Sequence, residues 1–319
     1  LRFPYFFPKS MPFADKAATM TEFIRRVRAM LTRLHKDIPI CVRVHNRLDM
    51  ARDAGMDIRT WLDDDLVQML NISPSYITQP DSDIEGYREA FPSAWILGEM
   101  TQCMTQGKSI ELSVGRSRKS TPEVLHALAH SFLERGADGI SFFNFTYYRD
   151  FSFGHPDKLD RFEPPYDALK GIADCVFLAL QEKHYYAGAN QFWPRALSQL
   201  PAELSVDRPV RLRVHVADAV TTDIFSSAIL RLMSDESAIE NCPIRAGLDG
   251  EALPGIVHGG ELFPTFYQEG IPHTHAPYRD FAVPLAGIRK GWNTFEFSLD
   301  TGGAAIQLDR MELALYHES

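Results

Sequence analysis

The sequence predicts an α/β protein in two parts, a parallel β/α portion followed by an antiparallel β-sandwich of the jelly-roll kind. Residues 1–190 alternate short apolar runs with segments of helical periodicity, a pattern typical of a parallel sheet covered by helices. After residue 205 the periodicity changes to two, with turn residues between the runs, as in antiparallel sandwiches. We therefore expect domains at 1–190 and 205–319, joined by a linker over 191–204.

Four strands are expected in the first domain, at residues 38–45, 66–72, 94–99 and 139–145. Each is a nearly continuous apolar run, which indicates a strand that is covered on both faces. Helices are expected over 14–36, 58–65, 82–91 and 166–184. A further helix is expected to begin at Thr121, because threonine is a good N-cap and Pro122 suits the first helical position.

The second domain shows five segments with a period of two. They are Val210–Val216, Ile229–Met233, Phe281–Leu285, Thr294–Leu299 and Ile306–Tyr316. Turn signals such as Asp249-Gly250 and Lys290-Gly291 separate some of these segments. Short strands at this spacing predict two packed antiparallel sheets.

The composition excludes several classes of function. A net charge of −9 does not suit a phosphate backbone, so nucleic acid is not an expected partner. No run of eighteen apolar residues occurs, so no membrane span is expected. Without a glycine-rich phosphate loop we expect no nucleotide, and we expect the site to hold no other cofactor and no metal. The widely spaced cysteines predict packing or incidental thiols rather than a disulfide framework or a zinc knuckle; they are Cys41, Cys103, Cys175 and Cys242.

The opening segment, LRFPYFFPKSM, lacks the order of a signal peptide and has no initiator methionine. We therefore expect the start of the gene product to precede Leu1. The compartment stays open, with a periplasmic or secreted bacterial location among the alternatives.

Polar side chains follow each expected strand of the first domain. They are Arg43, His45 and Asn46, then Asn71, then Glu99, and finally Asn144, Tyr147 and Tyr148. The carboxyl ends of parallel strands meet at one edge, where β/α barrels build their active sites, so we expect these side chains to gather there. Polar residues also end strands simply because loops are solvated, and Arg43 could equally form a structural salt bridge.

Three stretches of the first domain, LRFPYFFP, RTWLDDDLVQMLNIS and ADGISFFNF, resemble a class of bacterial glycoside-hydrolase-like proteins. These proteins have a (β/α) barrel of the family-10-like, clan-A type. The resemblance covers about residues 1–190 and implies that the four strands are the C-terminal half of a barrel. Because a complete barrel has eight strands, the N-terminal half is expected before Leu1 or on another chain. An open doubly wound sheet also fits four strands.

The resemblance implies a carbohydrate substrate and names one catalytic residue. Glycoside hydrolysis uses two carboxyl groups. In clan-A barrels the nucleophile follows strand seven, which is Glu99 here, whereas the acid/base follows strand four and would precede Leu1. The residues then expected to bind sugar by hydrogen bonds or ring stacking are Arg2, Arg43, His45, Asn46, Asn71, Asn144, Tyr147 and Tyr148. The alternative for Glu99 is a solvated glutamate at a strand end.

Two other functions stay open. A non-catalytic carbohydrate-binding protein of the same architecture would lack the pair of catalytic carboxyls. In the second domain, Pro272-His273-Thr274-His275 followed by Asp280 resembles the His-x-His pair of cupin barrels, which binds a divalent metal. The other interpretation of this stretch is a polar surface loop.

Overall fold

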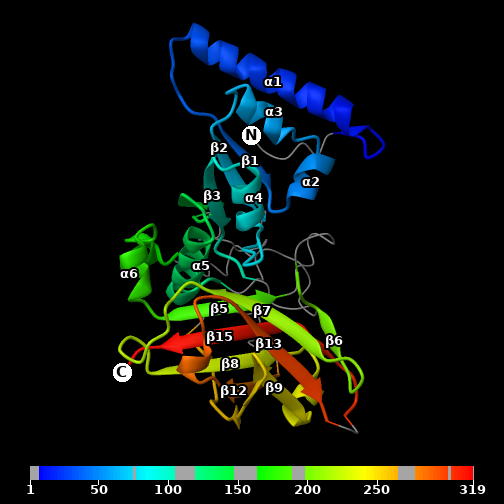
Figure 1. Cartoon of the computed structure of the whole chain (residues 1–319), viewed down its shortest axis with the longest axis vertical. Helices are drawn as coiled ribbons and strands as arrows, with labels where there is room; N and C mark the ends of the chain where they lie inside the picture. Colours follow the sequence, from blue (N-terminus) through cyan, green and yellow to red (C-terminus); the bar gives the residue numbers. More distant parts are fainter. Residues whose placement is uncertain are drawn as a thin grey trace, which may run out of the picture.

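The computed structural model of the protein describes residues 7–74, 77–104, 119–146, 164–188, 198–264, 277–300 and 303–318. Figure 1 shows a parallel sheet with its helices in one half of an elongated molecule and a stack of antiparallel strands in the other. No helix in these ranges is long and apolar enough to cross a membrane.

The first half is built on a four-stranded parallel sheet. Its strands are β1 (Cys41–His45), β2 (Met69–Ser73), β3 (Trp95–Met100) and β4 (Gly139–Phe142), and they lie side by side in chain order. All four predicted strands are therefore present and parallel. This arrangement is consistent with part of a barrel, and closure into a barrel stays a prediction.

The helices of this half follow from local sequence signals. They are α1 (Phe13–Arg33), α2 (Leu48–Asp53), α3 (Ile58–Asp63), α4 (Ile84–Ala90) and α5 (Pro122–Glu134). As predicted, Thr121 caps α5 by accepting a hydrogen bond from the Val124 amide, with Pro122 at the first helical position. Asp57 and Asp83 cap α3 and α4 in the same way.

The two faces of the parallel sheet differ in chemistry. One face packs Val42, Val44, Leu70, Ile72 and Ile96 into the core with the helices. Since side chains alternate along a strand, the residues between them point to the other face. That face carries Arg43, Asn71 and Glu99, so the sheet has an apolar side toward its helices and a polar side opposite.

In the described residues, the second half contains two larger antiparallel sheets around one apolar core, and a separate antiparallel pair, β14-β6. One sheet has the order β10-β9-β13-β7, and the other has the order β11-β12-β8-β15-β5. The strands are β5 (Lys183–Gly188), β6 (Ala202–Leu204), β7 (Val210–Val216), β8 (Ser227–Met233), β9 (Ile244–Leu248), β10 (Glu251–Leu253), β11 (Gly255–Ile256), β12 (Tyr278–Ala282), β13 (Gly291–Leu299), β14 (Ile306–Leu308) and β15 (Arg310–Tyr316). Four of the five predicted segments lie largely in strands, whereas Phe281–Leu285 shares only its first two residues with β12 and ends where the 3-10 turn Leu285–Gly287 begins. The arrangement is consistent with the predicted sandwich.

The helix predicted over residues 166–184 is wrong. The chain forms a 3-10 turn at Tyr166–Leu169, the short helix α6 (Cys175–Ala179) and then strand β5. Gly171 has a φ of +71°, a left-handed conformation that breaks the helical run. Strand β5 pairs with β15 in the antiparallel sheet, although it precedes the linker placed at 191–204.

Helix α5 joins the two halves. It packs on the parallel sheet through Phe132, and from its other side His130 contacts Asp218 at 3.1 Å between Nδ1 and Oδ1. The Ser131 hydroxyl lies 3.2 Å from Nδ1 of His215 on β7. Figure 1 shows α5 between the parallel sheet and strand β5.

Candidate functional site

Glu99 lies near the carboxyl end of β3, and only 2% of its surface is exposed. Within the described residues, four hydrogen bonds hold its carboxylate. Arg43 donates from Nε to Oε2 at 2.7 Å and from a terminal nitrogen to Oε1 at 2.5 Å. Asn71 donates to Oε2 at 2.9 Å, and the Ser73 hydroxyl donates to Oε1 at 2.5 Å. The carboxylate is thus bound by side chains from two neighbouring parallel strands, β1 and β2.

These contacts use the full accepting capacity of the group. A carboxylate offers about four lone-pair sites, and each oxygen of Glu99 accepts two hydrogen bonds. The Arg43 fork is the strongest part of the set, because a bidentate guanidinium matches carboxylate geometry. The same guanidinium lies 3.7 Å from the centre of the Phe143 ring, which limits its freedom to move away.

The orientation of Asn71 is itself fixed. Ser141 on β4 donates to the amide oxygen of Asn71 at 2.8 Å, so the amide nitrogen faces Glu99. A chain of polar contacts therefore crosses all four strands, from Arg43 on β1 to Ser141 on β4.

Burial and hydrogen bonding act in opposite directions on Glu99. Burial is the largest effect and raises the pKa of its carboxyl group above the ordinary value, although Arg43, Ser73 and Asn71 oppose this by favouring the charged form. The Arg43 fork therefore offsets only part of the effect of burial on this carboxyl group.

His45 and Asn46 end β1 at the same edge, and both are buried. Burial and the nearby Arg43 charge lower the pKa of His45 to about 4, so the ring is neutral at pH 7. The Tyr87 hydroxyl donates to the His45 carbonyl at 2.6 Å and fixes this turn. The Asn46 side-chain nitrogen donates to no group among the described residues, which leaves it available to a ligand.

Three further polar residues, at or beyond the carboxyl ends of β2 and β3, were not among the predicted site residues. Ser73 bonds Glu99, and Gln79 and Gln102 follow β2 and β3 with 2% and 0% of their surface exposed. The side-chain nitrogen of Gln79, and both polar atoms of the Gln102 amide, find no partner in the part of the chain that the structure describes. The rule that selected the other candidates could have found them, because each lies at the carboxyl end of a strand or up to six residues beyond it.

The remaining candidates are placed as follows. Asn144 lies beyond β4 with a φ of +53°, a left-handed conformation that asparagine tolerates better than most residues. Arg2, Tyr147, Tyr148 and the segment 272–275 lie outside the described residues.

Asp280, the carboxylate of the cupin alternative, is buried and forms a bidentate pair with Arg231, with both contacts at 2.8 Å. Both of its oxygens are therefore engaged by a cation, which disfavours a metal at Asp280.

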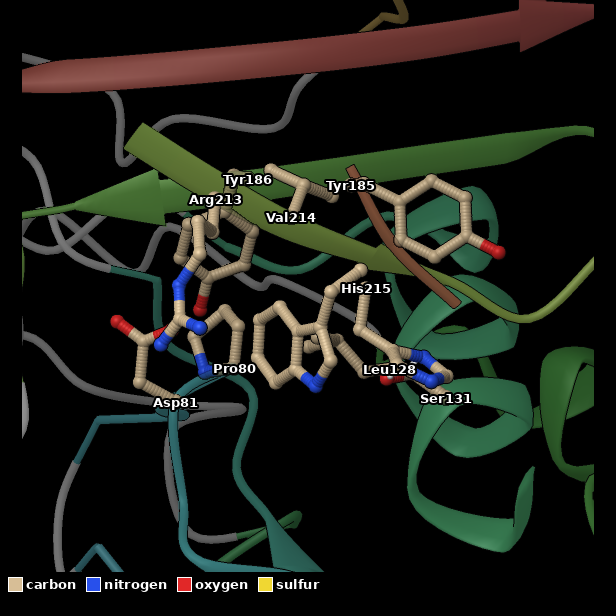
Figure 2. A pocket seen from close by; sticks show the side chains of 10 residues that line it. Pro80, Asp81, Leu128, Ser131, Tyr185, Tyr186, Arg213, Val214 and His215 are labelled. Carbon is tan, nitrogen blue, oxygen red and sulfur yellow. Dashed lines mark hydrogen bonds between the residues drawn. The ribbon is translucent and has the colours of Figure 1, made fainter. Parts of the chain in front are cut away.

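A second polar cluster lies at the junction of the two halves, and Figure 2 shows it lining a small hollow. Asp81 accepts a hydrogen bond from Gln199 at 3.2 Å, and burial raises its pKa to about 6. Figure 2 shows the Arg213 side chain directed toward Asp81. The Arg213 guanidinium also lies 5.0 Å from the Trp292 ring centre. This hollow is narrow and has room only for small groups. Among the described residues, the unpartnered amide nitrogens of Asn46, Gln79 and Gln102 all lie beyond the strands of the parallel sheet.

Comparisons with known proteins give partial similarity only. No protein-family model matches the chain, and no curated protein matches it. A beta-porphyranase of glycoside hydrolase family 86 from the gut bacterium Bacteroides plebeius shares 11% identity at a TM-score of 0.28, over 43% of this chain and 21% of its own.

Two structures of BuGH86 with neoagarooctaose give similar values. The wild-type protein and a substituted variant each share 14% identity at a TM-score of 0.27, over 42% of this chain. The match covers 19% of the wild-type chain and 18% of the variant chain, so this chain spans about a fifth of each structure. At these TM-scores the overlap says nothing about what this chain binds or converts, and the family-10-like type stays a prediction.

Proposed function

We propose that the edge of the parallel sheet is a carbohydrate site and that Glu99 acts there as the nucleophile of a glycoside hydrolase. One observation carries the proposal: a buried glutamate at the carboxyl end of a parallel strand is bound by an arginine, an amide and a hydroxyl. The arginine favours the ionised form that a nucleophile needs. The unpaired amides of Asn46, Gln79 and Gln102 would supply hydrogen bonds to sugar hydroxyls.

In the proposed reaction, one oxygen of Glu99 attacks the anomeric carbon and forms a glycosyl ester as the bond to the leaving oxygen breaks. The leaving oxygen takes a proton from a second carboxyl group, and water then cleaves the ester. The proposal assigns that acid to no residue of this sequence. For the attack, Glu99 must give up one of its four hydrogen bonds. The Ser73 hydroxyl is the donor that we expect to turn away, because it can rotate without breaking an ion pair.

The alternative is a non-catalytic carbohydrate-binding protein. The observation that favours it is the saturation of the carboxylate, since all four of its accepting sites are used. In that case the Glu99–Arg43 ion pair would have a structural role at the base of the site, and the unpaired amides would make the contacts with sugar.

Glu99→Gln separates these possibilities when it is tested on a panel of poly- and oligosaccharides that includes neoagarooctaose. For a hydrolase we expect turnover to fall by at least about a thousandfold while sugar binding persists. Glu312→Gln is the matched control, because Glu312 is equally buried and pairs with Arg310 at 2.6 Å in the antiparallel half. Circular dichroism and thermal unfolding confirm that each variant is folded at the assay temperature.

A further variant tests the nucleophile directly. With an activated aryl glycoside, Glu99→Ala plus azide should regain turnover and release a glycosyl azide, because azide replaces the missing carboxylate. Sugar binding by the unaltered protein without any turnover would favour the binding protein. If the panel shows no sugar binding and no turnover, both proposed functions are overturned.

A further inference from the structure

A second cluster of reactive side chains lies away from Glu99, between helices α5 and α6. His130 and Glu134 are four residues apart on α5 and therefore share one face of that helix. Cys175 is the first residue of α6. One ligand atom from each of these three residues lies within 4.8 Å of the others.

The histidine of this cluster is held in a defined orientation. Only 4% of the His130 side chain is exposed, and its Nδ1 lies 3.1 Å from Oδ1 of Asp218. Asp218 is also 2% exposed and is fixed by Tyr185, which donates to Oδ2 at 2.5 Å, and by Lys183 at 3.2 Å. With Nδ1 on a carboxylate, Nε2 is the nitrogen left to a ligand, and no hydrogen bond to it is found within the described residues. A carboxylate behind a histidine is the usual support of a metal-binding imidazole.

We propose that His130, Glu134 and Cys175 form a binding site for a divalent transition metal of the zinc class. Imidazole, carboxylate and thiolate are all zinc ligands, and the mixed set favours zinc or cobalt over the hard cations magnesium and calcium. Three protein ligands leave a fourth position open for water or another small ligand.

Binding requires two local changes. Glu134 pairs with Lys290 at 2.6 Å, but the two side chains are 27% and 51% exposed, and partly exposed pairs of this kind contribute little stability. The Cys175 thiol must also lose its proton to the solvent as the sulfur–metal bond forms, since only the thiolate ligates. No spacing pattern in the sequence points to this site, because Cys175 comes from a separate segment about forty residues beyond Glu134.

Cobalt provides a direct test. The full chain is treated with a chelator, separated from it, and titrated with Co²⁺ and then with competing Zn²⁺. We expect one equivalent to bind, with a near-ultraviolet thiolate-to-cobalt charge-transfer band and the visible absorption of four-coordinate cobalt. Added Zn²⁺ should remove both signals, because zinc lies above cobalt in affinity for such sites.

Variants assign the ligands. Cys175→Ser should abolish the charge-transfer band, and His130→Ala should weaken binding by at least about a hundredfold. Asp218→Asn should keep the band but lower affinity by about 10–100-fold, because it removes only the support of the histidine. Cys242→Ser is the matched control and should change neither, since Cys242 lies in the antiparallel half.

The proposal fails if cobalt binds without the thiolate band, if Cys175→Ser leaves the band intact, or if no stoichiometric binding is detected. Far-ultraviolet circular dichroism of each metal-free variant distinguishes the loss of a ligand from the loss of the fold. None of these measurements depends on sugar binding or hydrolysis, so the outcome is independent of the function proposed for Glu99.

Discussion

Arg43 reaches across strand β2 to bind Glu99 on β3. Its own neighbour in the sheet register is Asn71, and Asn71 donates to the same carboxylate. The Arg43 and Glu99 side chains are 12% and 2% exposed, so the ion pair is largely shielded from water. Two contacts at 2.5 and 2.7 Å offset part of the desolvation of the two charges.

Removing one partner of this ion pair should lower the stability of the folded protein. Arg43→Met leaves a buried carboxylate without its cation, and we expect the free energy of unfolding to fall by about 3–5 kcal/mol. Glu99→Gln should have an effect in the same direction, because it leaves a buried guanidinium. The double variant should lose clearly less than the sum of the two single losses. Urea unfolding of all four proteins measures this coupling, and simple additivity would show that the two charges do not interact.

The junction should make stability depend on pH through Asp81. The pKa of Asp81 is raised to about 6 by burial, against about 3.9 in an unfolded chain. Between these values the folded protein keeps a proton that the unfolded chain has lost, so this group lowers the free energy of unfolding as pH rises through the window.

Asp81→Asn removes the titration and keeps an oxygen that can accept from Gln199. We expect the variant to be more stable than the unaltered protein by about 1–3 kcal/mol at pH 8, and equally stable near pH 4. Urea unfolding at the two pH values checks this. A stability difference that is the same at both pH values would assign the change to packing rather than to ionisation.

Gly98 allows β3 to approach α5 closely. A Cβ atom at this position would lie 2.5 Å from Cδ2 of Phe132, whose ring is fully buried. Gly98→Ala should therefore lower the free energy of unfolding by about 1–3 kcal/mol through overpacking. Gly287→Ala is the control, because its Cβ would meet its nearest neighbour, Leu248, at an ordinary 3.5 Å, and we expect a loss of less than about 1 kcal/mol.

A second substitution tests the cause of the Gly98→Ala effect. Replacing Phe132 with Leu in the Gly98→Ala background removes the atoms that clash and should recover part of the loss. Thermal or urea unfolding compares Gly98→Ala with the double variant. If adding Phe132→Leu lowers the free energy of unfolding further, the packing argument is wrong.

The apolar patterns and local signals of the sequence determined much of the secondary structure. Val42, Val44, Leu70 and Ile72 fall in runs that can be buried only in a covered sheet, so the parallel strands were predictable. Thr121 and Pro122 specify the start of α5 by local chemistry alone. The antiparallel strands β7 and β13 follow from strict alternation, because one face of each meets the shared core.

Tertiary structure decided which polar groups meet. The sequence placed Arg43, Asn71 and Glu99 near strand ends, but only the register of three strands shows that Arg43 and Asn71 both bind the carboxylate of Glu99. The helix predicted over 166–184 is broken at Gly171, and its last two residues belong to Lys183–Gly188, which pairs with β15, a strand distant in the sequence. The His130, Glu134 and Cys175 cluster likewise depends on the packing of α6 against α5. Local signals act within a few residues, whereas pairing and packing join segments far apart in the chain, and for that reason the sites could be read only from the folded structure.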